Sequence, residues 1–181
     1  MPKLSRPLPP GPYDIIYADP PWEVKRGPDW NSNGPSKPLP YATMTVQDIQ
    51  ALPVPSITAR NGWLFLWVIN KYIEAGYGVA RAWGFKPSVL LTWTKPRHGL
   101  GIGGTFVQTT EHLLFARKGK FSACHRIDTT WFAYPRRNHS EKPHEIRALI
   151  DSIAPLHARK CELFARSSWP GWDAWGDELD A

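Results

Sequence analysis

Residues 13–22 read YDIIYADPPW, and this stretch decides the fold. Its first six residues are mainly apolar, β-branched or aromatic, which is typical of a buried strand. Pro20 and Pro21 cannot continue a β-ladder or a helix, because proline lacks the N–H donor and fixes φ. The chain must therefore leave the sheet there, with Asp19 at the carboxyl edge of the strand. Ligands of open α/β sheets bind at that edge.

The carboxylate of Asp19 suits the handling of a flat amino-purine or amino-pyrimidine. An aromatic amine is a poor nucleophile because its lone pair is delocalised into the ring. Hydrogen bonds to a carboxylate and to the rigidly held carbonyl of Pro20 would localise that lone pair and aim it at a carbon electrophile. Trp22 could stack on the base or wall its pocket. The alternative is a strand-end aspartate that caps a turn, followed by prolines that only break the strand.

Length and composition indicate a single soluble domain. The chain has 181 residues, of which 42% are hydrophobic and 21% charged, as expected for a globular protein with a substantial core. The formal net charge of +6 favours polyanionic partners such as nucleic acid. No apolar run reaches the ~18 residues that span a bilayer, and residues 1–12 form a proline-rich arm without a secretory signal. We therefore expect a cytoplasmic protein with one domain over residues 13–181.

The cysteines and histidines do not indicate a metal site. Cys124 and Cys161 are the two cysteines, and neither has metal-ligand spacing around it, so we expect both to be reduced core thiols. His98, His112 and His144 likewise have no partner at a spacing that would form a metal centre. The sequence predicts no bound metal.

A strand, a helix and a second strand follow the opening stretch. Residues 62–69 are a continuous apolar run of the kind found in parallel sheets. Residues 72–83 fit a helix that ends at Gly84, and residues 88–94 fit another strand. This spacing predicts a βαβ unit.

The second half of the chain predicts further α/β elements. A strand pair is expected around residues 111–117 and 121–125. Residues 143–154 fit an amphipathic helix with proline in its first turn, and residues 159–165 fit a last strand. The pattern predicts one α/β domain without internal repeats.

Residues 19–22 and four further ordered blocks resemble the adenine N6-methyltransferases related to the catalytic subunit of the eukaryotic mRNA adenosine methyltransferase, in the minimal form found in bacteria and phages. The motif IV of that family is Asp-Pro-Pro-Trp, as in residues 19–22. The resemblance implies a Rossmann-like methyltransferase sheet in circularly permuted order, with motif IV near the N-terminus and ahead of the cofactor strand. The other blocks are LPYATM (39–44), LFLWV (64–68), HSEKP (139–143), and ELFAR (162–166) with the Gly-Trp and Trp-Gly pairs at 171–172 and 175–176.

The resemblance also implies roles for individual residues, with S-adenosylmethionine as cofactor. The catalytic motif would be Asp19, Pro20, Pro21 and Trp22. The acceptor-base pocket would be bordered by Tyr41, Trp67 and Ser140. The cofactor would be bound by Asp19, Lys142, Glu162, Phe164, Arg166 and Asp177, although Asp177 stands where the family subunit carries an amide.

Structural roles are the alternative for several of these residues. Tyr41 could pack on the core as part of a lid, and Trp67 could belong entirely to the core. Glu162 could be a buried carboxylate paired with a basic neighbour. Lys142 and Arg166 would be solvated surface charges in the absence of the family resemblance.

The expected reaction is direct transfer of a methyl group to N6 of adenine in DNA. The same transfer to RNA and a catalytically silent nucleic-acid-binding module are the alternatives. Because no separate target-recognition domain is visible, specificity would be loose or supplied by a homodimer or another partner. The expected phosphate contacts, which could equally be ordinary solvated charges, are Lys25, Arg26, Lys37, Arg97, Arg136 and Arg137.

Overall fold

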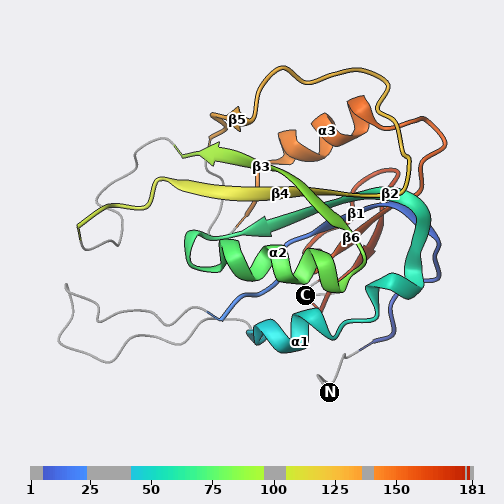
Figure 1. Cartoon of the computed structure of the whole chain (residues 1–181), viewed down its shortest axis with the longest axis horizontal. Helices are drawn as coiled ribbons and strands as arrows, with labels where there is room; N and C mark the ends of the chain where they lie inside the picture. The colour runs from blue at the N-terminus through green and yellow to red at the C-terminus, as the bar shows by residue number, and fades with distance from the viewer. Residues whose placement is uncertain (1–5, 24–41, 96–104, 136–140, 178, 180–181) are drawn as a thin grey trace.

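A computed structural model gives an α/β sandwich with one central sheet. Helix α3 (His144–Ile153) covers one face of the sheet, and α1 (Val46–Gln50) and α2 (Ile73–Ala82) cover the other (Figure 1). No helix in the described part of the chain is long and apolar enough to cross a bilayer. The structure describes residues 6–23, 42–95, 105–135, 141–177 and 179.

The sheet has seven strands in the order β5-β3-β4-β2-β1-β6-β7. β4 runs antiparallel to its neighbours β2 and β3, and the other adjacent pairs are parallel. Two short 3₁₀ helices, η1 (Val54–Ile57) and η2 (Asn70–Tyr72), flank β2. The strands are β1 (Tyr13–Ala18), β2 (Thr58–Val68), β3 (Lys86–Thr94), β4 (Thr110–Lys118), β5 (Trp131–Phe132), β6 (Lys160–Leu163) and β7 (Asp173–Trp175).

β1 lies inside the sheet, between β2 and β6, and is buried on both faces. Ile15 and Tyr17 pack on the α3 side, whereas Ile16 and Ala18 pack on the side of α1 and α2. Burial on both faces explains why the strand is an almost continuous apolar run. The predicted strand over residues 13–18 is confirmed.

β1 and β6 are far apart in sequence but adjacent in the sheet. Ile15 lies opposite Lys160 and Ala18 lies opposite Leu163, in parallel register. The carboxyl ends of the two strands therefore meet at one edge of the sheet, where ligands of open α/β sheets bind. The predicted α/β class is confirmed, with β1 near the N-terminus and ahead of β6 in the chain.

The two strands of the predicted βαβ unit are parallel, as expected, but they are not neighbours in the sheet. β2 and β3 are parallel and are joined by α2, yet β4 lies between them and pairs with both. The interval between β2 and β3 is thus filled by a strand that comes later in the chain. Hydrophobic patterns do not encode which strands become neighbours.

The predicted strand over residues 121–125 is wrong. Both edges of β4 are already occupied by β2 and β3. A strand that directly follows β4 therefore cannot pair with β4. Phe121 instead packs its ring against Trp63, with centroids 4.7 Å apart, and its carbonyl accepts the Trp63 indole N–H at 3.2 Å. The sheet continues at β5, which the sequence did not predict.

The two cysteines differ in their surroundings. Cys161 is buried on β6, and burial raises the pKa of its thiol to about 12. Cys124 is exposed, so the expectation of a second core thiol is wrong. It lies in the segment that does not form a strand, and its Sγ lies 3.4 Å from the Ala154 carbonyl oxygen.

Candidate active site

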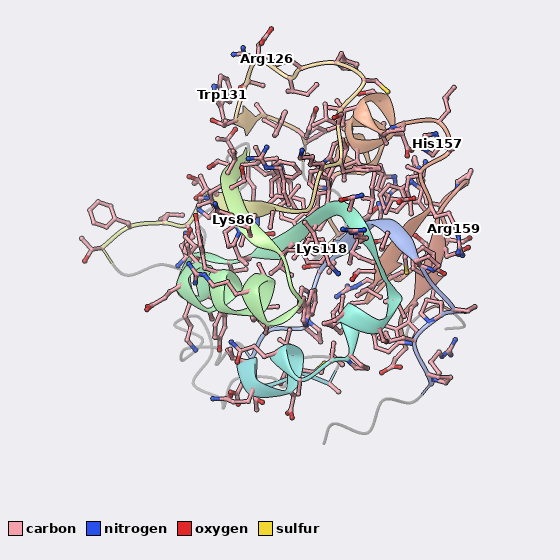
Figure 2. The ribbon with its side chains drawn as sticks, turned by 45° about the vertical axis from the view of Figure 1, so that its right-hand side comes forward. Lys86, Lys118, Arg126, Trp131, His157 and Arg159 are labelled. Atoms are coloured by element: carbon pink, nitrogen blue, oxygen red, sulfur yellow. The ribbon has the colours of Figure 1, made fainter. Side chains whose placement is uncertain are left out.

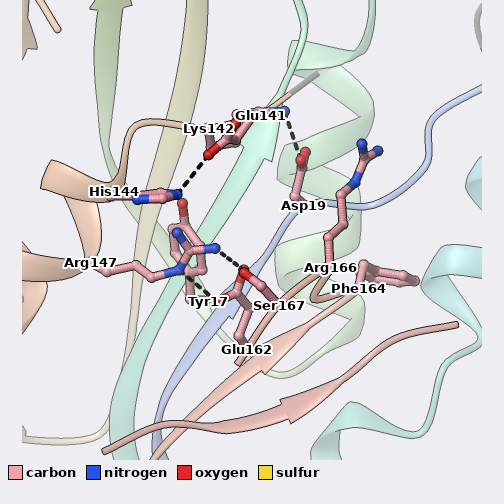
Figure 3. A pocket seen from close by; sticks show the side chains of 10 residues that line it. All are labelled: Tyr17, Asp19, Glu141, Lys142, His144, Arg147, Glu162, Phe164, Arg166 and Ser167. Carbon is pink, nitrogen blue, oxygen red and sulfur yellow. Dashed lines mark hydrogen bonds and ion pairs between the residues drawn. The ribbon is translucent and has the colours of Figure 1, made fainter. Parts of the chain in front are cut away.

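A pocket of about 280 Å³ opens at the carboxyl ends of β1 and β6 and at the start of α3. Figure 3 shows side chains from these elements converging on it. Its lining combines three carboxylates with three basic side chains besides His144, so it suits a ligand that carries both charges. The lining residues are Tyr17, Asp19, Glu141, Lys142, His144, Arg147, Glu162, Phe164, Arg166 and Ser167.

Asp19 and Lys142 meet at this pocket, although 123 positions separate them in the sequence. The Lys142 ammonium donates to Oδ2 of Asp19 at 2.7 Å, and the side chains are only 12% and 22% exposed. Burial acts to lower the pKa of Lys142, but the carboxylates of Asp19 and Glu111 outweigh it and raise that pKa above its usual value. Lys142 therefore stays charged and fixes the position of the Asp19 carboxylate.

Glu111 extends this charge pair, and sequence reasoning did not include it. Its Oε2 lies 3.5 Å from the Lys142 ammonium, and its Oε1 accepts from Lys95. Burial acts to raise the pKa of Glu111, yet Lys142 and Lys95 hold it below its usual value. The side chains thus form a row of alternating charges in the order Lys95, Glu111, Lys142 and Asp19. The only sequence signal was a polar residue inside an apolar strand.

Glu162 and Arg147 form a buried ion pair in the lining of the pocket. The guanidinium donates to both carboxylate oxygens, at 2.7 and 2.6 Å. Burial raises the pKa of Glu162, although the hydrogen bonds from Arg147 favour its charged form. Glu162 is therefore the buried, paired carboxylate of the structural alternative, and it also faces the pocket. Arg147 was not predicted, because its partner lies on another element.

Tyr17 and Trp67 join the ion pair to the strands beneath it. The Trp67 indole donates to the Tyr17 hydroxyl at 2.6 Å, and the guanidinium of Arg147 lies 5.4 Å from the Tyr17 ring centroid. Trp67 is buried, and Lys142 lies over its ring at 5.5 Å. Trp67 thus supports Lys142 from below, and it is not among the residues that line the pocket.

Phe164 has an unusual backbone at the end of β6. Its φ is 62°, a left-handed conformation that bulky residues rarely adopt. The ring packs edge-on against Trp175, with centroids 5.5 Å apart. Strain of this kind gathers at ligand sites, where the surrounding structure maintains it. Here it brings Phe164 and the neighbouring Arg166 to the pocket.

The two prolines turn the chain out of the sheet, as predicted. The carbonyl of Pro20 accepts the Trp22 N–H at 2.8 Å, and the carbonyl of Pro21 accepts the Met44 N–H at 2.8 Å. The Pro20 oxygen has a second lone pair, which can accept from a ligand. These two bonds fix the backbone of the motif directly after Asp19.

Trp22 does not lie at the lip of the pocket. Its side chain is buried, its indole donates to the Trp67 carbonyl at 3.0 Å, and its ring stacks on Tyr72 at 5.2 Å. Trp22 thus packs against β2 and η2 in this structure, and its stacking on a base stays a prediction. Its contacts position the motif from the side of β2.

Replacing Trp22 by phenylalanine tests this positioning role. The ring can still stack on Tyr72, but the hydrogen bond to the Trp67 carbonyl is lost, so we expect the free energy of unfolding to fall by about 1–3 kcal/mol. Urea denaturation measures this loss, and ligand affinity should remain unchanged. Weaker ligand binding at unchanged stability would instead place Trp22 in the pocket.

The remaining predicted residues divide into two groups. Asp177 is described and exposed, and it does not line the pocket. Among the residues that the structure describes, no cluster of His, Cys, Asp or Glu could hold a metal ion. The predicted positions outside the described residues are Tyr41, Ser140, Lys25, Arg26, Lys37, Arg97, Arg136 and Arg137.

Comparison with known proteins gives matches over nearly the whole chain. The type II methyltransferase M.MunI of a Mycoplasma species is 32% identical over 191 residues, which cover 95% of this chain and 80% of that protein. The N(6)-adenosine-methyltransferase MT-A70-like protein of Arabidopsis thaliana is 32% identical, over 94% of this chain. The human N(6)-adenosine-methyltransferase catalytic subunit METTL3 is 29% identical, also over 94% of this chain.

The matched lengths differ between these relatives. The chain spans 24% of the Arabidopsis protein and 29% of the human one, so it corresponds to one part of each. The MT-A70 family matches residues 13–178, which include β1, the pocket and β7. The chain belongs to the MT-A70 family of N6-adenine methyltransferases.

Proposed function

We propose that this chain transfers a methyl group from S-adenosylmethionine to N6 of adenine in DNA. The observation that carries the proposal is the Asp19 carboxylate, held by Lys142 at the mouth of a pocket lined by both charges. A carboxylate fixed in this way can accept hydrogen bonds from an exocyclic amine without rearranging.

The pocket fits S-adenosylmethionine in the chemistry of its side chains. The ligand has an amino-acid end with both charges and a nucleoside end with an aromatic base and hydroxyl groups. Lys142 and Asp19 would hold the amino-acid end, and Phe164 and Arg166 would hold the nucleoside end. When bound, S-adenosylmethionine would supply a methyl group on a positively charged sulfur.

The chain's own residues would orient the acceptor. Asp19 and the free lone pair of the Pro20 carbonyl would accept the two N–H groups of the adenine amine, which localises its lone pair and aims it in line. Lys142 holds the Asp19 carboxylate in place during this step. Alignment and exclusion of water would supply the rate, without a covalent enzyme intermediate.

Similarity to a type II methyltransferase supports DNA as the polymer. The chain covers 80% of a type II methyltransferase but only 24–29% of the plant and human N(6)-adenosine-methyltransferases. RNA is the second candidate, because those longer relatives are similar over 94% of this chain.

One assay compares the two polymers directly. Purified protein is incubated with tritiated S-adenosylmethionine and matched single-stranded and duplex oligonucleotides of DNA and RNA. We expect incorporation into DNA, with a higher rate on single strands, because flipping a base out of a duplex costs a few kcal/mol. Incorporation into RNA alone would contradict the proposal of DNA.

We also propose residues 13–181 as one catalytic domain and residues 1–12 as a proline-rich arm, whose described residues begin at Arg6. The Trp175 indole donates to the carbonyls of Arg6 and Pro7, at 3.3 and 3.0 Å, so these two residues of the arm contact the domain. Both cysteines are free, which is consistent with a bacterial or phage-infected cytoplasm. A homodimer or a separate partner would supply sequence recognition.

A further inference from the structure

Five basic residues gather at the edge of the sheet opposite the pocket. They come from the starts of β2 and β3 and from the end of β4 with the turn after it. Segments 58–62, 85–88 and 116–120 contain these five cations and no acidic residue. Figure 2 labels two of them, Lys86 and Lys118. The group, called the basic edge below, consists of Arg60, Lys86, Arg117, Lys118 and Lys120.

Lys86 and Arg117 are a like-charge pair directly opposite each other across β3 and β4. Both are exposed, and like charges at facing positions destabilise a sheet. Among the described residues, no carboxylate forms an ion pair with either of them, nor with Arg60 or Lys120. This repulsion destabilises the free protein, and a bound anionic partner would offset it.

The local backbone presents these charges from a fixed frame. The Lys118 ammonium donates to the Thr58 hydroxyl at 2.8 Å. Gly119 has a φ of +59°, and a side chain there would collide with the Asn61 amide oxygen. That oxygen accepts the Lys120 N–H at 2.9 Å. A fixed turn loses little conformational entropy when it binds a partner.

Protection of an exposed strand edge explains only part of this pattern. β5 covers β3 at Thr92 and Trp93 alone, and Lys86 with Pro87 would discourage pairing with another chain along the rest of β3. Arg117 needs no such explanation, because β4 is paired on both sides. A cation placed there, facing another cation, indicates a binding role.

We propose that the basic edge binds the phosphates of the same nucleic acid whose adenine enters the pocket. The inference rests on the proposed function and deepens it. Glu111 and Arg117 lie six positions apart on β4, which is about 20 Å at ~3.4 Å per residue. That length corresponds to about six nucleotides of a stacked, B-form strand at ~3.4 Å each. The flank of the polymer, at this distance from the target base, would contact the basic edge.

The test compares Lys86→Gln/Arg117→Gln with the matched control Arg81→Gln/Arg126→Gln. Each double variant removes two exposed charges. Fluorescence anisotropy measures affinity for single-stranded DNA of about 30 nucleotides with a central adenine, between about 50 and about 200 mM salt. We expect the slope of log affinity against log salt to fall by about 1.4 for the basic-edge variant, and to stay unchanged for the control.

Methylation kinetics on long and short DNA distinguish an effect at the basic edge from an effect in the pocket. We expect the basic-edge variant to raise KM on the long DNA by about tenfold, with kcat unchanged, because two phosphate contacts are lost. DNA of about three nucleotides with a central adenine has one nucleotide on each side and is too short to reach the basic edge, so the variant should methylate it like wild type. Its melting temperature should equal or exceed that of wild type, because a like-charge pair is removed. Arg60→Gln/Lys120→Gln provides an independent second variant.

Each other outcome has a definite meaning. An unchanged salt slope in both basic-edge variants, with methylation retained, overturns this inference and leaves the proposed function intact. An equal loss of slope in the control also overturns it, since net charge alone would then explain binding. A lower kcat on the short DNA would place the effect in the pocket and overturn it as well. Failure of the wild type to methylate any nucleic acid overturns the proposed function, and the inference with it.

Discussion

Asp19→Asn is expected to lower kcat for methyl transfer by about 10²–10³-fold, the usual effect of removing one preorganised polar contact from a reacting group. Asparagine keeps the shape of the side chain but loses the charge, and its amide can turn an N–H toward the adenine amine. Lys142 retains Glu111 as a partner at 3.5 Å, so the pocket should stay intact. We expect affinity for S-adenosylmethionine to fall by no more than about tenfold, which equals about 1.4 kcal/mol.

Asp14→Asn is the matched control on the same strand. The Asp14 carboxylate accepts the Arg159 backbone N–H at 2.9 Å, at the opposite end of β1 from the pocket. Single-turnover kinetics with isotope-labelled cofactor should give wild-type rates for this variant. A wild-type rate for Asp19→Asn would remove Asp19 from the reaction.

Arg147→Met is expected to lower the free energy of unfolding by about 3–5 kcal/mol. The substitution leaves the Glu162 carboxylate buried without its partner. The two hydrogen bonds of 2.6 and 2.7 Å that satisfied the carboxylate would be lost. Urea denaturation of the two proteins measures the difference.

The double variant Arg147→Met/Glu162→Leu distinguishes the effect of an unpaired Glu162 charge from the effect of altered side-chain packing. Apolar replacements of a whole buried ion pair are often neutral or stabilising, so we expect the double variant to be more stable than Arg147→Met alone. Equal losses of unfolding free energy in the two variants would show that the unpaired Glu162 carboxylate does not cause the loss.

The local pattern predicted the elements that carry the chemistry. The apolar run before Asp19 identified β1, and Pro143 with the apolar spacing after it identified α3. The family resemblance through residues 19–22 and 139–143 assigned Asp19 and Lys142 to the same site. Their side chains meet at 2.7 Å in the structure. Patterns of this kind are local, and local pattern is what a sequence displays directly.

Contacts between distant elements could not be predicted in the same way. Arg147 and Glu162 pair across a helix and a strand, and Glu111 reaches Lys142 from β4. Trp22 has the same sequence context whether it faces a ligand or the core, and its packing on Tyr72 decides between them. β5 and β7 have two and three residues, which is too short for a reliable period-2 pattern.

The reaction proposed for this site is methylation of N6 of adenine in nucleic acid. The most direct measurement incubates adenine-containing DNA with the protein and S-adenosylmethionine labelled in its methyl group, and then analyses the digested nucleosides by mass spectrometry. We expect labelled N6-methyldeoxyadenosine with wild type and a loss of about 10²–10³-fold in its rate of formation with Asp19→Asn. Label on another base or another nitrogen, or equal labelling by the two proteins, would contradict this proposal.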